Sequence, residues 1–277
     1  MSHEGRSSRL STGVTLQYVT QGDPAGVPVV FLHGVTDSWR SFERVLPHLP
    51  EGVRAFAVTQ RGHGDSDRPL VGYRARDFAN DVASFLDAVG VESAVVVGHS
   101  MGGTNAIRFA LDHPERTRGL VLVAAFASFR GNAAVIEFSE MVVAGLTDPI
   151  DVHLARDFQQ STLARPIPAA YLDTVVAETM KVPARVWHAA FEALLDDECS
   201  AELSAVGVPT LVMSGGRDAF SDRAQQLALV GAIRGARRIE YEQAGHALHW
   251  EAPAEFATDL LTFVASLEER TMPALQL

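Results

Sequence analysis

One serine lies in a sequence pattern that makes it a candidate nucleophile. Residues 98–102 read Gly-His-Ser-Met-Gly, with Ser100 at the centre, between an apolar run typical of a buried strand and a helical pattern. A sharp turn from strand to helix strains the backbone at such a serine and requires small residues two positions before and after it. Gly98 and Gly102 meet this requirement. The pattern therefore predicts that Ser100 attacks a carbonyl carbon.

A serine hydroxyl is a weak nucleophile without a general base, and the chain has ten histidines that could supply one. His246 follows the predicted strand 237–241, so we expect it at the same edge of the sheet as Ser100. His249, three residues later, is the alternative base and should begin or flank the final helix. His99 should point away from the site, because adjacent residues diverge at a sharp turn.

The base needs a carboxylate that holds its tautomer and stabilises its imidazolium form. Asp218 closes the segment 215–218, Gly-Gly-Arg-Asp, directly after the predicted strand 209–214. It should therefore reach the same edge of the sheet, and we predict that it is this carboxylate. Asp222 is the alternative, which we interpret as the N-cap of the following helix.

A tetrahedral intermediate needs two hydrogen-bond donors for its negatively charged oxygen. We expect one to be the backbone N–H of Met101, the residue after the nucleophile. The other should be the N–H of Val35, in the segment 33–37 that follows the predicted strand 29–32. Gly34 lets the backbone turn there, so that the next N–H can point into the site.

The elements that position these residues alternate between strands and helices. Several apolar runs are continuous rather than alternating, which is typical of strands buried on both faces of a parallel sheet. The helical patterns between them predict an α/β domain with right-handed crossovers. The predicted strands are 14–20, 29–32, 54–59, 94–97, 120–124, 209–214 and 237–241, and the predicted helices of this sheet are 77–89, 100–111, 222–230 and 253–269.

The rhythm of strands and helices breaks in the middle of the chain. Residues 126–205 show four helical patterns and no strand of this kind. Since Ser100 precedes this block and the proposed acid and base follow it, one sheet must be assembled from both ends of the chain. We therefore predict a core domain of residues 1–125 and 206–277 with residues 126–205 inserted as a helical block. The four helices are predicted at 134–144, 151–161, 168–180 and 184–195, and we expect residues 271–277 to be frayed.

Composition excludes some classes of function. The 277 residues include 34 acidic and 23 basic side chains, a net charge of −11, which argues against nucleic-acid and anionic-membrane partners. The lone cysteine, Cys199, allows no intrachain disulfide. The longest apolar stretch has eight residues, and the start of the chain is polar, so we expect a cytoplasmic protein without a membrane span. No His, Cys and carboxylate cluster has metal-ligand spacing, so we expect no metal or organic cofactor. The oligomeric state stays open.

Taken together, these motifs resemble the α/β-hydrolase superfamily over about residues 10–270. The resemblance implies an α/β-hydrolase fold, with a mostly parallel eight-stranded sheet flanked by helices and a helical cap inserted after strand 6. It also implies the chain order serine, aspartate, histidine that is seen here. The motifs are His33-Gly34, Arg-Gly-His-Gly-Asp-Ser at 61–66, Gly-His-Ser-Met-Gly-Gly at 98–103, Gly-Gly-Arg-Asp at 215–218 and Gly245-His246.

The chain is most similar to small capped esterases and lactonases and to cofactor-free perhydrolase and haloperoxidase relatives. Haloalkane dehalogenases and epoxide hydrolases use an aspartate where this chain has Ser100, and epoxide hydrolases usually have proline where it has Thr36. The resemblance implies a serine hydrolase that cleaves an ester or lactone with an apolar group. Perhydrolysis, cleavage of a C–C bond and ligand binding with negligible turnover are the alternatives. Candidate substrate contacts are Trp39, Met101, Phe126, Phe129, Phe138, Met141, Phe158, Trp187, Phe191 and Leu248.

Overall fold

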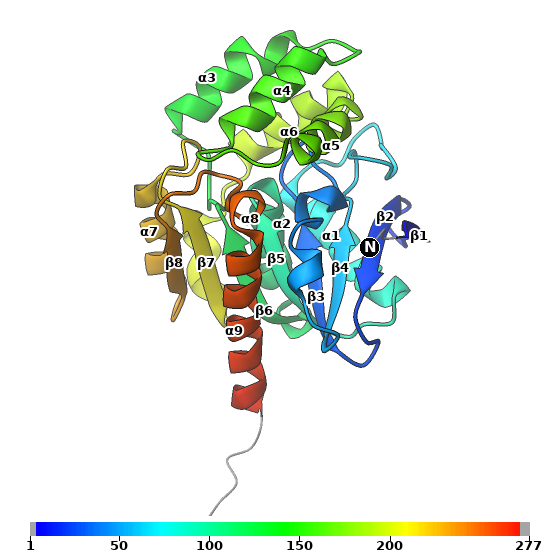
Figure 1. The fold of residues 1–277 in the computed structure, drawn as a ribbon, viewed down its shortest axis with the longest axis vertical. Helices are drawn as coiled ribbons and strands as arrows, with labels where there is room; N and C mark the ends of the chain where they lie inside the picture. The colour runs from blue at the N-terminus through cyan, green and yellow to red at the C-terminus, as the bar shows by residue number, and fades with distance from the viewer. Residues whose placement is uncertain (1–3, 272–277) are drawn as a thin grey trace, which may run out of the picture.

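The computed structural model describes residues 4–271, and they form an eight-stranded sheet with helices on both faces (Figure 1). The order of the strands is β1-β2-β4-β3-β5-β6-β7-β8. Of the end that we expect to be frayed, Thr271 closes the last helix and residues 272–277 lie outside the described residues. The strands are β1 Arg6–Arg9, β2 Thr15–Gln21, β3 Val27–Leu32, β4 Val53–Val58, β5 Ala94–His99, β6 Thr117–Val123, β7 Thr210–Gly215 and β8 Arg237–Tyr241.

The sheet is mostly parallel, as predicted. Strands β3 to β8 pair in parallel, whereas β1 with β2 and β2 with β4 pair antiparallel. Every residue of β5 is buried, which explains why the sequence there shows a continuous apolar run. The sequence did not predict β1. Its residues are Arg, Ser, Ser and Arg, so its strand conformation comes from pairing with β2 rather than from any apolar pattern.

Two apolar layers hold the helices against the sheet. Alternate strand residues such as Val96 pack with Phe85 and Ile107 on one face, while Val97 packs with Phe263 on the other. Helices α1, α2 and α7 therefore cover one face, and α8 and α9 cover the other (Figure 1). These helices are α1 Ala75–Ala88, α2 Met101–Asp112, α7 Arg223–Ala232, α8 Leu248–Glu251 and α9 Pro253–Thr271, with short 3-10 turns η1 Trp39–Phe42, η2 Leu46–His48, η3 Pro114–Arg116 and η5 Ser200–Ala205.

Four helices follow β6 and precede β7 in the chain, where the sequence predicts a helical block. They lie together beyond the carboxyl ends of the parallel strands (Figure 1). Side-chain and proline signals set their starts: Asn132 and Asp151 cap α3 and α4, and Pro168 and Pro183 precede α5 and α6. The helices are α3 Ala133–Met141, α4 Val152–Ser161, α5 Ala169–Met180 and α6 Ala184–Asp196, with the turn η4 Val143–Gly145 after α3.

A shared apolar cluster connects these helices to the sheet. It contains Trp187, Phe158 and Val176 from the helical block, together with Met101 and Phe126 from the end of the sheet. Throughout residues 4–271, the helices fall short of the combined length and apolar character that a membrane-spanning helix needs.

Candidate active site

Ser100 occupies a strained turn between β5 and α2. Its φ of 52° and ψ of −119° lie outside the usual regions for a residue with a side chain. A Cβ atom at Gly98 would lie 2.2 Å from the carbonyl oxygen of Gly102, and one at Gly102 would lie 2.3 Å from that of Leu32. Side chains at either position would collide with backbone. The turn therefore requires the small residues that the sequence pattern contains.

His246 and Asp218 form a buried hydrogen-bonded pair beside this turn. The Nδ1–H of His246 donates to Oδ2 of Asp218 over 2.9 Å, and both side chains are almost completely buried. The other carboxylate oxygen, Oδ1, accepts from the backbone N–H groups of Phe220 and Ser221 over 2.8 and 3.0 Å. The carboxylate is thus fixed from both sides. Because Nδ1 is engaged, Nε2 is the ring nitrogen that can exchange a proton with a substrate or nucleophile.

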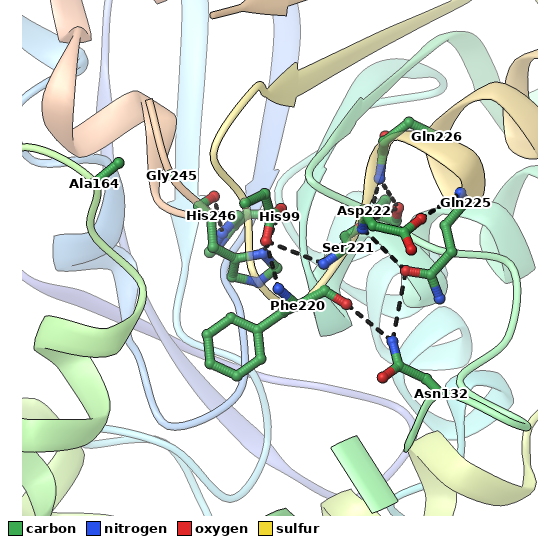
Figure 2. Close-up of polar contacts among 12 residues, drawn as sticks. His99, Asn132, Ala164, Phe220, Ser221, Asp222, Gln225, Gln226, Gly245 and His246 are labelled. Atoms are coloured by element: carbon green, nitrogen blue, oxygen red, sulfur yellow. Dashed lines mark hydrogen bonds and ion pairs between the residues drawn. The ribbon is translucent and has the colours of Figure 1, made fainter. Parts of the chain in front are cut away.

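The loop that carries Asp218 is tied to the start of the helical block. Asn132 donates from its amide nitrogen to the carbonyl oxygen of Phe220 over 3.0 Å (Figure 2). The Phe220 ring lies beside the imidazole of His246, with 5.2 Å between the ring centroids (Figure 2). At the far end of this loop, Asp222 accepts from the N–H of Gln225 over 2.8 Å and begins α7. The interpretation of Asp222 as an N-cap is thereby confirmed.

Three histidine rings lie next to one another, tilted by 54° and 57°, at this edge of the sheet. The ring of His99 lies 5.0 Å from that of His246 and 4.5 Å from that of His249. Burial lowers the pKa of His99 well below its usual value and lowers the pKa of His249 to about 3, so both are neutral at pH 7. His249 is enclosed in the protein, where its Nε2 lies 3.0 Å from Oγ of Ser41. It is therefore not placed to act as the base.

The expectation that His99 points away from the site is wrong, because His99 lines the same cavity as Ser100 and its ring lies against that of His246. Its Nε2 lies 3.2 Å from the carbonyl oxygen of His246, so the ring supports the loop of the neighbouring histidine. Adjacent residues do diverge at the turn, but the loop carrying Gly34 folds back over both of them. A Cβ atom at Gly34 would lie 2.9 Å from Nδ1 of His99 and 3.3 Å from Cβ of Ser100.

The residues expected to supply the oxyanion donors are near Ser100, since Met101 follows it and Val35 follows Gly34, where a Cβ atom would lie 3.3 Å from Cβ of Ser100. Met101 begins α2, so its N–H has no partner within the helix and belongs to the positive helix end. Val35 lines the cavity in the loop that passes closely over Ser100. The next residue, Thr36, has a φ of 68°, which bends the loop sharply at this point.

A cavity lies between the strand ends and the helical block. Ser100, His246 and Asp37 line it on the side of the sheet, and Gln159 and Thr162 add polar groups from the helical block. The rest of the cavity wall is apolar and mostly aromatic. This part of the wall includes Phe129, Val135, Phe138, Phe158, Phe191, Leu194 and Phe220.

Several predicted substrate contacts are on the cavity wall and several are not. Phe129, Phe138, Phe158 and Phe191 line the cavity. The prediction is wrong for six residues. Trp39 and Leu248 pack on the sheet face covered by α9, while Met101, Phe126 and Trp187 pack among the side chains behind the wall, and Met141 is 77% exposed on the outside. Helical periodicity indicates that a side chain is buried but not which apolar layer receives it.

Sequence reasoning also missed residues of this wall. Asp37, Gln159, Thr162 and Trp250 line the cavity, and Asp37 and Gln159 are joined by a hydrogen bond of 3.0 Å. Asp37 lies within the segment 33–37, where the sequence pattern indicated only backbone donors. Gln159 follows a wall residue directly on α4 and carried no sequence signal. Within residues 4–271, no group of three or more His, Cys, Asp and Glu side chains is arranged to hold a metal ion.

Known proteins are similar to this chain in both sequence and architecture. The family described as alpha/beta hydrolase fold matches residues 27–253. A 2-(acetamidomethylene)succinate hydrolase from Mesorhizobium japonicum is 36% identical over 118 residues, which are 42% of each protein. The chain spans only about two fifths of the length of the first curated relatives that it matches.

Other similarities extend over nearly the whole chain. A 2-hydroxy-6-oxononadienedioate/2-hydroxy-6-oxononatrienedioate hydrolase from Paraburkholderia xenovorans is 29% identical over 270 residues, covering 91% of both proteins. The crystal structure of esterase RhEst1 from Rhodococcus sp. ECU1013 superposes with a TM-score of 0.85 and 28% sequence identity, covering 95% of this chain and 99% of that chain.

Proposed function

Since the chain belongs to the α/β-hydrolase family, we propose that it is a serine hydrolase that cleaves a carboxylic ester or lactone with an apolar group. One observation carries the proposal. Ser100, which lies on a strained turn, lines the same cavity as His246, and His246 is hydrogen-bonded to Asp218 over 2.9 Å. A nucleophile, a base and a carboxylate that orients the base are what acyl transfer requires.

In the proposed first half-reaction, Oγ of Ser100 bonds to the carbonyl carbon and its proton passes to Nε2 of His246. The N–H groups of Val35 and Met101 bind the oxygen that becomes negative. Collapse of the intermediate breaks the bond to the alcohol oxygen, which takes the proton from His246. The acyl group is then an ester of Ser100.

In the second half-reaction, water gives a proton to His246 and its oxygen bonds to the acyl carbon. The bond to Ser100 breaks, the serine oxygen regains the proton, and the acid leaves. Asp218 stabilises the imidazolium in both halves and does not itself take the proton. For a lactone, the alcohol and the acid are two ends of one product.

We further propose that residues 126–205 act as a cap on a core of residues 1–125 and 206–277. The wall residues Phe138, Phe158 and Phe191 come from α3, α4 and α6, whereas Ser100 and His246 come from the ends of the sheet. The cap would thus select the substrate while the core performs the chemistry. Its mostly aromatic lining favours an apolar acyl or alcohol group.

The test is a panel of p-nitrophenyl esters of increasing chain length and of γ- and δ-lactones. We expect hydrolysis by the native protein and labelling of Ser100 by a fluorophosphonate. Ser100→Ala should lose about a millionfold in kcat, as in comparable sites, whereas the same change at the exposed Ser7 should leave the rates unaltered. An unchanged rate in Ser100→Ala would exclude the mechanism. Tight binding of esters without turnover would instead favour a ligand-binding protein.

Cleavage of a C–C bond is the second candidate, favoured by the similarity to the P. xenovorans hydrolase over 91% of both chains. That relative is named for a dienedioate, which carries two carboxylates. Here no Lys or Arg lines the described cavity around Ser100, and this favours the uncharged ester. Turnover of 2-hydroxy-6-oxononadienedioate without ester hydrolysis would reverse the choice.

A further inference from the structure

One carboxyl-bearing residue of the cavity wall is not used by the proposed mechanism. Asp37 is in the loop after β3, is 4% exposed, and lines the same cavity as Ser100 and His246. The rest of the wall away from the sheet is mostly aromatic and aliphatic. A carboxyl group facing such a wall is costly to bury unless it has hydrogen-bond partners.

The surrounding side chains hold Asp37 in one position. Oδ1 accepts from Nε2 of Gln159 on α4 over 3.0 Å, and Oδ2 accepts from Oγ of Ser41 over 3.2 Å. Ser41 is fixed in turn, because Nε1 of Trp250 donates to its Oγ over 3.1 Å. Gln159 also donates to Oγ1 of Thr179 on α5 over 2.6 Å. The carboxyl group is therefore preorganised by the core on one side and by the helical block on the other.

These contacts leave part of the carboxyl group unused. Two carboxylate oxygens offer about four lone-pair positions, and two of them are occupied. Among the ion pairs formed within residues 4–271, none includes Asp37, so its charge is not balanced by a cation of the protein. Burial raises the pKa of Asp37 to about 7, despite the hydrogen bonds from Gln159 and Ser41. A donor group from a ligand would complete this environment.

We propose that Asp37 is a specificity-determining residue that accepts a hydrogen bond from a hydroxyl or ammonium group of the substrate. The proposal rests on the proposed function, since it concerns the same cavity. The substrate class is then an ester or lactone with a largely apolar body and one hydrogen-bond donor near the carbonyl group that Ser100 attacks. The aromatic wall binds the apolar body and Asp37 selects the donor.

The experiment compares esters that differ only in this donor. The probes are p-nitrophenyl hexanoate, its 2-hydroxy, 3-hydroxy and 2-amino derivatives, and the propyl and 2-hydroxyethyl esters of hexanoic acid. We expect at least one donor-bearing probe to exceed its unsubstituted partner in kcat/KM by roughly tenfold to a hundredfold, the range for a hydrogen bond to a charged group. The hydroxyl and amino arms distinguish the two donors.

Asp37→Asn should reduce this preference, so that kcat/KM for the donor-bearing esters falls towards that of their unsubstituted partners. An amide oxygen still accepts from a hydroxyl group but no longer balances an ammonium charge, so the loss should be larger for the amino ester. Asp173→Asn is the matched control. Asp173 is an exposed carboxylate on α5 that pairs with Arg156, and the same change there should alter no ratio.

Two results would overturn this proposal and leave the proposed function intact. One is equal kcat/KM for the two esters of every matched pair, a comparison that uses only the native protein. The other is a uniform loss in Asp37→Asn across substituted and unsubstituted esters, since that would mean a purely structural role. Failure of all the esters, together with no phosphonate label on Ser100, would overturn the proposed function and this proposal with it.

Discussion

At the scale of single residues, Asp218, behind His246, and Asp37, on the cavity wall, are held in different ways. Asp218 accepts two backbone N–H groups and the imidazole of His246. Asp37 has two side-chain donors and no cationic partner in the described ion pairs. Backbone dipoles and the imidazole orient the first carboxyl group, whereas burial raises the pKa of the second to about 7. The two residues are therefore suited to different tasks.

Asp218→Asn tests the proposed role of the first carboxylate. An amide can donate to Nδ1 of His246, and this favours the tautomer in which Nε2 carries the proton and cannot act as a base. We expect kcat to fall about 10⁴-fold, as for the same change in comparable sites, with little change in the melting temperature. Asp222→Asn is the control, because asparagine is an equally good N-cap and the rate should stay within about twofold. Equal rates for both variants would contradict the assignment.

The buried carboxyl of Asp37 should make stability depend on pH. Its pKa is raised from 3.8 to about 7 by burial, with Glu178 adding to the shift and His246 opposing it. Between these values the folded protein keeps a proton that the unfolded chain releases, so this group's contribution to stability declines as pH rises from about 4 to 7. Asp37→Asn removes that dependence. The melting temperature of the variant minus that of the native protein should therefore be more positive at pH 8 than at pH 5.

Thermal melts followed by circular dichroism at pH 5, 6, 7 and 8 would measure this difference. The exposed Asp173→Asn variant should show a difference that does not change with pH. A pH-independent difference for Asp37→Asn as well would show that its carboxyl group titrates normally in the folded protein.

At the scale of the elements, the turn between β5 and α2 is determined by backbone contact rather than by side chains. The N-terminus of α2 lies so close to the end of β3 that a Cβ atom at Gly102 would come within 2.3 Å of the carbonyl oxygen of Leu32. This close approach brings the loop after β3 over Ser100. The strain at Ser100, with its φ of 52°, is held in place by these contacts.

Gly102→Ala should therefore destabilise the protein strongly. Overpacking typically costs about 1–3 kcal/mol. Here the added Cβ atom would collide with the carbonyl oxygen of Leu32, a backbone atom that is held in the sheet. Gly231→Ala is the control, since Gly231 lies in α7 with open space around it, and alanine there should stabilise by about 0.5–1 kcal/mol. Urea unfolding of both variants would measure the two effects, and similar stabilities would contradict the close approach.

At the scale of the whole molecule, the sheet and the helical block share one apolar cluster. Met101 and Phe126 from the sheet end pack with Phe158 and Trp187 from the helical block. A polar link between Asp37 and Gln159 joins the same two parts beside the cavity. Neither part can unfold alone without exposing this shared surface to water.

We therefore expect one cooperative thermal transition rather than two. Calorimetry should give a calorimetric enthalpy of unfolding equal to the van't Hoff enthalpy. Trp187→Ala should lower the stability by about 3–5 kcal/mol and keep the transition single. Two resolved transitions would mean that the helical block unfolds independently of the sheet.

Much of the core architecture follows from local sequence patterns. Strands such as β3, β5 and β7 are buried on both faces and therefore show as apolar runs, and the helices between them show as periodic stripes. The short helix α8 and the edge strand β1 were not predicted. Each consists of four residues, and their conformations depend on contacts with α9 and β2.

The chain by itself determined which residues could do chemistry and at which edge they meet, because the carboxyl ends of parallel strands share one edge of a sheet. Ser100, Asp218 and His246 needed nothing more than their places after predicted strands. Only the tertiary structure decided the cavity wall. Periodicity says that Phe158 and Trp187 are both buried, yet the packing of α4 against α6 puts the first on the cavity and the second behind it. The role of Asp37 also depends on tertiary structure, since one of its two partners, Gln159, lies 122 residues away in the sequence.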